Sequence, residues 1–228
     1  SSEESSETTE VSVSEGGFDT NQRTDIYFDA SASDDGDGSK ENPYKTLDSS
    51  RLKNNSNIYF GEGKYNNALD LCILENCSIY GKNPDKTVIN FNDYNSGANI
   101  ISNGNFRAFN ITFSNMHFEA RNLFELTNTR LELNRFGLAN NAIILTLKDN
   151  PCELNINNCT FFSGFADYGG AISMQKGTLN VKDSTFLKNA ANGDGGAIYL
   201  ENSELIAKNL QISNCSATIG GAILSVNS

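Results

Sequence analysis

A tetrapeptide that recurs at a nearly fixed spacing constrains the fold of this chain more than any other feature. Gly-Gly-Ala-Ile occurs at 169–172, 195–198 and 220–223, so successive copies begin 26 and 25 residues apart. A second mark, a polar residue followed by Phe or Ile, keeps the same period at 160–161, 185–186 and 211–212. Two independent marks with one period indicate a chain built from stacked structural repeats.

Within each period the residues alternate as in short β-strands. The last full period holds three such segments, at 197–200, 204–207 and 210–212, separated by turn-forming residues. A period in the mid-twenties with brief strands describes one coil of a β-solenoid, and the next coil must cover its thin apolar face about 4.8 Å away. The sequence therefore predicts an all-β fold, a right-handed parallel β-helix, because parallel crossovers almost always take that hand.

The repeat is looser upstream, where 140–143 is a degenerate copy of the tetrapeptide, but the strand rhythm persists. These segments fit about four further coils, or about seven in all. The first coil would expose an unpaired edge that needs a cover. Residues 43–52 form the one plausible helix, and we expect them to be a short N-terminal capping helix.

The negative charge of the chain is concentrated near its N-terminus. Residues 1–40 hold eleven acids and two bases, which accounts for −9 of the net charge of −11. We expect 1–25 to be an acidic flexible leader, 26–54 the first strand and cap, and 55–228 the coils. Such acidity excludes nucleic acid as a partner, and without a run of about 18 apolar residues we expect no direct membrane insertion. The repeat is unfinished at residue 228, so we expect a segment of a longer protein.

The chain has five cysteines, and none lies in a pattern typical of zinc sites. They are Cys72, Cys77, Cys152, Cys159 and Cys215. The spacing allows a disulfide within each of the first two pairs, while buried free thiols in the core are the preferred interpretation.

Two parts of the sequence resemble known families. Gly-Gly-Ala-Ile, combined with the Phe-x-x-Asn at 186–189, resembles the repeat of the chlamydial polymorphic membrane proteins. The opening at 26–30 and 35–47 is similar to the start of the pectate-lyase-like domains of adhesin-like proteins from methanogenic archaea. The resemblance spans 26–228. It implies a right-handed β-helix in the extracellular space, at the cell surface, that attaches to proteins or glycans of another cell.

The same fold also hosts polysaccharide lyases and hydrolases, which need carboxylates that converge on a cleft. The acids of the coils are scattered, and His117 is the only histidine. We therefore expect no enzyme and assign no catalytic residue. A polysaccharide lyase or hydrolase, and a purely structural stalk, remain as alternatives to the adhesin.

Two candidate sites follow from the residues. Asp34, Asp35 and Asp37 lie in a loop with glycines at 36 and 38, and oxygen ligands at alternate positions of such a loop suit Ca²⁺, although a solvated acidic turn has the same composition. No other cofactor is expected. Tyr94, Phe165 and Tyr168 lie in the segments 92–97 and 163–168 and are candidates for ligand contact, unless the rings only cover coil edges.

Overall fold

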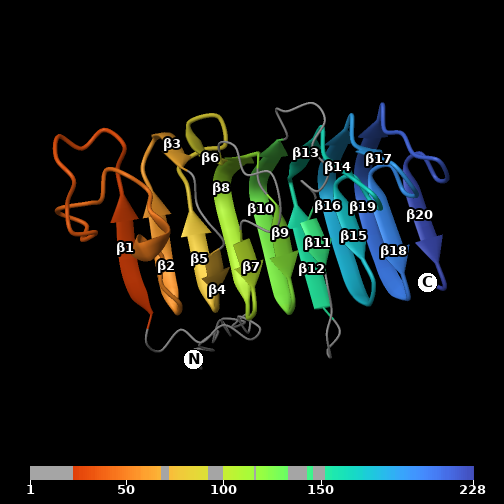
Figure 1. Cartoon of the computed structure of the whole chain (residues 1–228), viewed down its shortest axis with the longest axis horizontal. Coiled ribbons are helices and arrows are strands. Elements are labelled where there is room, and N and C mark those ends of the chain that lie inside the picture. The colour runs from red at the N-terminus through yellow and green to blue at the C-terminus, as the bar shows by residue number, and fades with distance from the viewer. Residues whose placement is uncertain (1–22, 68–71, 92–99, 116, 133–142, 146–151) are drawn as a thin grey trace, which may run out of the picture.

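The computed structural model describes residues 23–67, 72–91, 100–115, 117–132, 143–145 and 152–228. Two large parallel β-sheets run the length of an elongated molecule, with the first strand at one end and the last at the other (Figure 1). The predicted leader, 1–25, lies almost wholly outside these residues.

Within the described ranges the larger sheet has eleven strands, all paired in parallel. Its strands are β1 (Thr24–Phe28), β2 (Ser56–Phe60), β3 (Gly63–Asn67), β5 (Cys77–Tyr80), β6 (Thr87–Phe91), β8 (Phe106–Ser114), β10 (Leu123–Glu132), β12 (Cys152–Asn157), β13 (Thr160–Phe162), β16 (Gly177–Leu187) and β19 (Ser203–Ser213). The second sheet has seven, namely β4 (Cys72–Leu74), β7 (Ile100–Ser102), β9 (Phe118–Ala120), β11 (Ile143–Leu145), β15 (Ile172–Met174), β18 (Ile198–Glu201) and β20 (Ile223–Val226). A two-stranded sheet joins β14 (Phe165–Ala166) to β17 (Ala190–Ala191).

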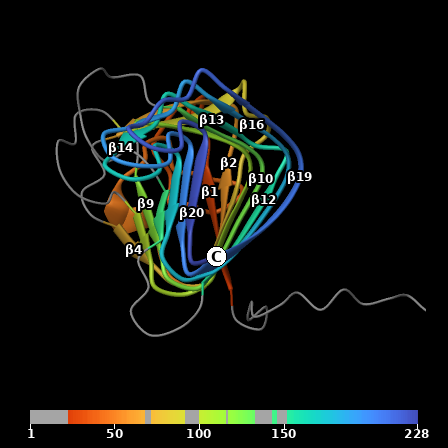
Figure 2. The same cartoon turned by 90° about the vertical axis from the view of Figure 1, so that its right-hand side faces the viewer.

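The chain passes through the two large sheets in turn, and we call each such circuit a coil. Viewed along the long axis, the coils superpose around a common interior (Figure 2). Equivalent residues of successive repeats pair with each other in the sheet: Ile172 pairs with Ile198, and Ile198 with Ile223. The sequence repeat therefore sets the register of the stack. The all-β, parallel prediction is confirmed, and the arrangement is consistent with a β-solenoid.

Like residues stack on like residues inside the coils. Phe28 stacks on Phe60 with ring centroids 4.7 Å apart, and Phe161 stacks on Phe186 at the same distance. All four rings are buried. Because strand residues point alternately inward and outward, each coil adds one layer to the core, and the layer is sealed by the coils on either side.

The long strands bend at residues in the left-handed backbone region. Asn110, Asn128, Asp183 and Asn209 have φ values of 56°, 45°, 50° and 53°. Asn and Asp tolerate this region better than other non-glycine residues. Their side chains also bond from coil to coil, and Asn209 Nδ2 donates to Asp183 Oδ1 at 2.8 Å. The frequent asparagines are therefore structural corner residues.

The glycine repeat has a steric cause. Gly169, Gly195 and Gly220 have φ values of +62°, +69° and +63°, in the region that L side chains avoid. A Cβ at Gly169 would lie 2.0 Å from the Ile172 carbonyl oxygen. No other residue fits this corner without moving the backbone.

The prediction of a capping helix at 43–52 is wrong. The segment contains one 3-10 turn, η1 (Ser49–Arg51), after a stretch that binds the outer edge of β1. Tyr44 N–H donates to the Tyr27 carbonyl, and Asp29 N–H donates to the Tyr44 carbonyl, both at 2.9 Å. Leu47 is buried in the core. These backbone bonds hold the chain extended, so a loop rather than a helix covers the first strand.

Candidate binding face

The outer face of the larger sheet carries two continuous rows of side chains, each with one residue from every coil. The first row consists of Asp25, Asn57, Ser78, Arg107, Glu125, Asn155, Asn180 and Ile206. The second row lies two residues further along the same strands and consists of Tyr27, Tyr59, Tyr80, Phe109, Thr127, Asn157, Lys182 and Lys208. Neighbours within a row are one strand spacing apart, about 4.8 Å.

Aromatic rings form the first half of the second row, over β1, β2, β5 and β8. Tyr27 stacks on Tyr59 at 4.8 Å, Tyr59 on Tyr80 at 5.1 Å, and Tyr80 on Phe109 at 5.1 Å between ring centroids. The planes of neighbouring rings differ by only 7° to 16°. Both faces of Tyr59 and Tyr80 are thus occupied by neighbouring rings, and this half of the face is packed.

Arg23 lies beside the first row over the same strands and bonds to its side chains. Its guanidinium donates to Asn57 Oδ1 at 2.9 Å and to Ser78 Oγ at 2.9 Å. It also donates to the Ser56 carbonyl at 2.6 Å. The aromatic half of the face therefore has its polar groups bonded to one another.

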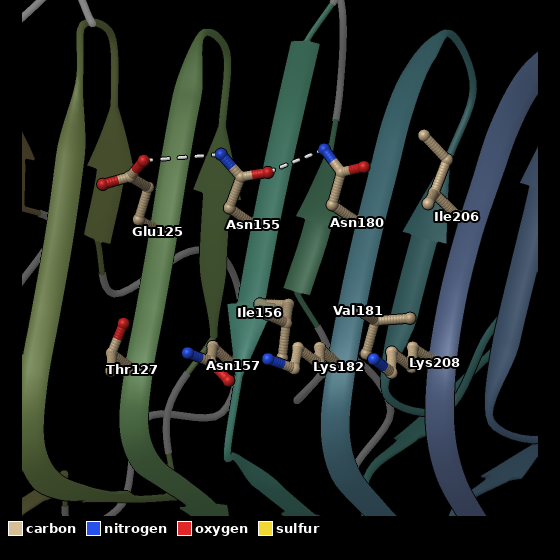
Figure 3. Close-up of a pocket in the computed structure, with 10 residues that line it drawn as sticks. All are labelled: Glu125, Thr127, Asn155, Ile156, Asn157, Asn180, Val181, Lys182, Ile206 and Lys208. Carbon is tan, nitrogen blue, oxygen red and sulfur yellow. Dashed lines mark hydrogen bonds between the residues drawn. The ribbon is translucent and has the colours of Figure 1, made fainter. Parts of the chain in front are cut away.

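A shallow groove of about 460 Å³ opens over β10, β12, β16 and β19, where the second row changes from rings to smaller or polar side chains. It is lined by the last four residues of each row together with Ile156 and Val181 (Figure 3). The change occurs between Phe109 and Thr127, which are paired in register on β8 and β10.

A chain of hydrogen bonds runs along the first row of the groove. Asn180 Nδ2 donates to Asn155 Oδ1 at 2.8 Å, and Asn155 Nδ2 donates to Glu125 Oε1 at 3.4 Å (Figure 3). Arg107 lies on the other side of Glu125, with Nε 3.8 Å from Oε2. Among the described residues that line the groove, Glu125 is the only carboxylate.

Two lysines end the second row. Lys182 and Lys208 occupy paired positions on β16 and β19. Asp183 lies beside them, with Oδ2 3.6 Å from Lys182 Nζ. A hydrogen bond from Asn209 lowers the pKa of Asp183, and the two lysines add to the effect. The two lysines make this end of the groove cationic, although the chain as a whole is acidic, with 28 acids and 17 bases.

The three predicted calcium ligands have separate environments. Asp35 accepts from Arg51 Nη1 at 2.8 Å, and the Arg51 hydrogen bonds lower the pKa of Asp35 to about 2. Asp37 accepts from the Ser39 N–H at 3.0 Å, and Asp34 is exposed. Within the described parts of the chain, no three His, Cys, Asp or Glu side chains form a group that could hold a metal ion. Calcium binding by these residues stays an untested prediction.

The predicted contact aromatics lie outside the groove. Phe165 begins β14 and is half-buried, where it pairs with Ala190. Tyr168 is 50% exposed, and its ring lies 5.1 Å from that of Tyr199. Tyr94 falls outside the described residues. The groove residues were not predicted, although Asn155, Asn180 and Ile206 repeat at the same spacings of 25 and 26 residues as the glycine mark.

The thiols and the histidine belong to the interior. Free thiols are found at Cys77, Cys152, Cys159 and Cys215, the first three of them buried. Burial raises the pKa of Cys152 and Cys159 to about 12. The structure agrees with the interpretation of these four as free thiols, while the Cys72 side chain lies outside the described part. His117 is 3% exposed and does not line the groove.

Comparison with known proteins finds one similarity. Residues 183–201 match the Chlamydia polymorphic membrane protein repeat. The matched segment begins at the corner residue Asp183, includes the second Gly-Gly-Ala-Ile and ends with β18. Part of one coil is therefore similar to that repeat. Comparisons with curated proteins and with solved structures gave no match. No helix in the described ranges is long and apolar enough to cross a membrane.

Proposed function

We propose that this chain is a segment of a right-handed parallel β-helix at the outside of a cell, and that it acts as a non-catalytic adhesion module. The observation that carries the proposal is the match of 183–201 to a repeat of polymorphic membrane proteins, which falls in register with the stacked coils. Stacked coils make an extended scaffold with a long continuous surface, a form suited to contact with a large partner. The partner is a protein or glycan on the surface of another cell.

The residues of the groove support binding rather than turnover. Glycoside hydrolysis commonly uses two carboxyl groups on opposite sides of the scissile bond. The described lining of this groove supplies one carboxylate, Glu125, which accepts from Asn155 at 3.4 Å and lies beside Arg107. Glu153, outside the lining, accepts from the same Asn155 amide at 2.9 Å, so one amide holds the two carboxylates together instead of leaving them on opposite sides of a bound sugar. Its other polar groups are mostly amides and ammonium groups, which can form hydrogen bonds with a ligand.

A paired assay tests the proposal. The purified full chain is labelled and applied to a panel of whole cells and to a glycan array, with heat-unfolded chain as the control. The same preparation is incubated with acidic polysaccharides, and new reducing ends and unsaturated products are measured. Saturable binding without product supports the adhesion module. Product formation overturns the non-catalytic assignment, and absence of binding to every cell and glycan overturns adhesion and favours the structural stalk.

A further inference from the structure

Lys182 and Lys208 are an unfavourable pair in the chain by itself. They lie opposite each other on neighbouring strands, one strand spacing of about 4.8 Å apart at the backbone. Like charges at directly opposed positions of a sheet are destabilising. Asp183 offsets one of the two charges through its contact with Lys182. A net positive charge remains at this end of the groove, and an anionic group bound there would relieve the repulsion.

The acids of the same face do not neutralise this end. Glu153 and Glu204 precede the second row by four residues on β12 and β19, a separation of about 13 Å along an extended strand. This distance exceeds the screening length of about 8 Å at physiological salt. The carboxylates that contact the groove amides, Glu125 and Glu153, lie on β10 and β12, where both accept from Asn155 Nδ2. An anionic group of a ligand is therefore favoured at the lysines on β16 and β19 and disfavoured at the opposite end of the groove.

The position of the groove favours a glycan over an acidic peptide. A peptide strand binds a sheet through free backbone groups at an edge. Here the backbones of β10, β12 and β16 are each paired on both sides, and among the groove strands as described only β19 has an unpaired edge. The face offers side chains instead, and Asn155, Asn157 and Asn180 carry amides that can both donate and accept. Such groups match the hydroxyls of a sugar.

The shape of the groove fixes the direction of the ligand. The open rows run across the strands, along the long axis, over four strands that span about 14 Å. At the end away from the lysines, Phe109 has Tyr80 on one face and the shorter Thr127 on the other. The row of rings therefore ends at Phe109, the groove lining begins with Glu125 and Thr127 on the next strand, and the lysines lie at the far end.

We propose that the groove over β10, β12, β16 and β19 binds a linear glycan bearing carboxylate or sulfate groups, with the sugar hydroxyls on the amides and an anionic group at Lys182 and Lys208. The proposal rests on the proposed function and names the ligand class of its binding face. Carboxylate and sulfate groups offer the same charge to the lysines, so both sources are compared in the test.

Calorimetric titration of the full chain tests the ligand class. The probes are an oligogalacturonate, a sulfated heparin oligosaccharide, a neutral glucan oligosaccharide of equal length, and an oligoglutamate peptide. We expect one or both anionic glycans to bind, with affinity that falls as salt rises. Binding of the neutral glucan with equal affinity would overturn the role of the lysines. Tightest binding of oligoglutamate would assign the groove to acidic peptides instead.

Two variants test the site. Lys182→Gln combined with Lys208→Gln should weaken anionic glycan binding about tenfold, since each exposed ion pair contributes up to about a factor of five. The matched control, Lys40→Gln combined with Lys176→Gln, removes the same charge at exposed positions outside the groove lining. Thr127→Phe extends the aromatic row into the groove and should abolish binding while the far-ultraviolet circular dichroism and melting temperature stay unchanged.

Equal loss in both lysine variants would show a general charge effect and overturn the site, as would full binding by Thr127→Phe. Whole-cell binding is measured with the same variants. If the native chain and the groove variants bind cells equally and the native chain binds no anionic glycan, the glycan site is wrong and the adhesion module stands. If the native chain binds an anionic glycan but no cell, the site stands and adhesion fails.

Discussion

The two halves of the outer face share one backbone register and differ in what fills the second row. Over β1 to β8 the row is four stacked rings, and Arg23 bonds the polar groups beside them. Over β10 to β19 the row consists of Thr127, Asn157 and two lysines, and a groove opens. In a stack of coils, one position can therefore change from a stacked ring to a groove-lining side chain between two adjacent strands, without any break in the register.

The largest expected effect is on stability in the aromatic half. Tyr59→Ala removes two stacked contacts and should lower the free energy of unfolding by about 1 to 3 kcal/mol, because each aromatic pair contributes about 0.5 to 1.5 kcal/mol. Urea unfolding measures the change. The matched variant Asn157→Ala, in the same row of the groove half, should change it by less than about 0.5 kcal/mol. Equal effects would contradict the division into a packed and an open half.

A smaller effect is expected from the amides of the groove. Asn180→Ala removes the 2.8 Å hydrogen bond to Asn155 and should cost about 1 kcal/mol of unfolding free energy. Urea unfolding is again the measurement, with Asn180→Asp as a variant that keeps the shape of the side chain. A loss larger than that of Tyr59→Ala would show that the groove amides, and not the rings, hold this face together.

Low pH should destabilise the segment that covers β1. The Arg51 hydrogen bonds lower the pKa of Asp35 from its ordinary value of 3.8 to about 2. A carboxyl whose pKa is lowered by folding stabilises the fold above its unfolded pKa, and this stabilisation is lost as pH falls from about 4 to 2. The protection of the β1 amides against hydrogen exchange, taken relative to the intrinsic exchange rate at each pH, should fall in this window. Asp35→Asn should weaken the dependence without abolishing it, because hydrogen bonds also lower the pKa values of Asp29, Asp37 and Asp48 in the same segment. An unchanged profile in that variant would exclude Asp35 as a source.

The smallest expected effect is a gain in stability, whereas the preceding variants lose stability. Lys208→Gln removes the repulsion with Lys182 and should raise the free energy of unfolding by about a few tenths of a kcal/mol. Thermal melting at low salt detects the change best, because salt screens exposed charges. Lys176→Gln, at an exposed turn, is the control. A lower stability for Lys208→Gln would show that the two lysines do not repel each other.

The regular part of the fold could be predicted from the sequence, because residues one period apart lie opposite each other when the coils stack. The pairs Phe161 with Phe186 and Phe186 with Ile212 follow directly from the second sequence mark. The helix at 43–52 could not be excluded in this way. Its extended form depends on the backbone bonds of Tyr44 to β1, which no local pattern reveals.

The candidate site could be predicted only in part. Asn155, Asn180 and Ile206 keep the period and could have been aligned with one another. The groove they line, however, begins only where the aromatic row on the preceding strands ends. Tyr80 and Phe109 are 29 residues apart and Phe109 and Thr127 only 18, yet each pair is adjacent in the sheet. The coils before residue 140 differ in length, so a fixed period hides the aromatic row and the place where it stops.

The pairing of each coil with the next along the long axis also determines how the molecule responds to force. A pull on its two ends loads the bonds between strands in tension, one coil after another, rather than shearing a whole sheet at once (Figure 1). Each coil of 25 or 26 residues that peels away releases about 80 to 90 Å of extended chain. We therefore expect such a rod to lengthen in steps when its ends are pulled, with a drop in force as each coil comes away.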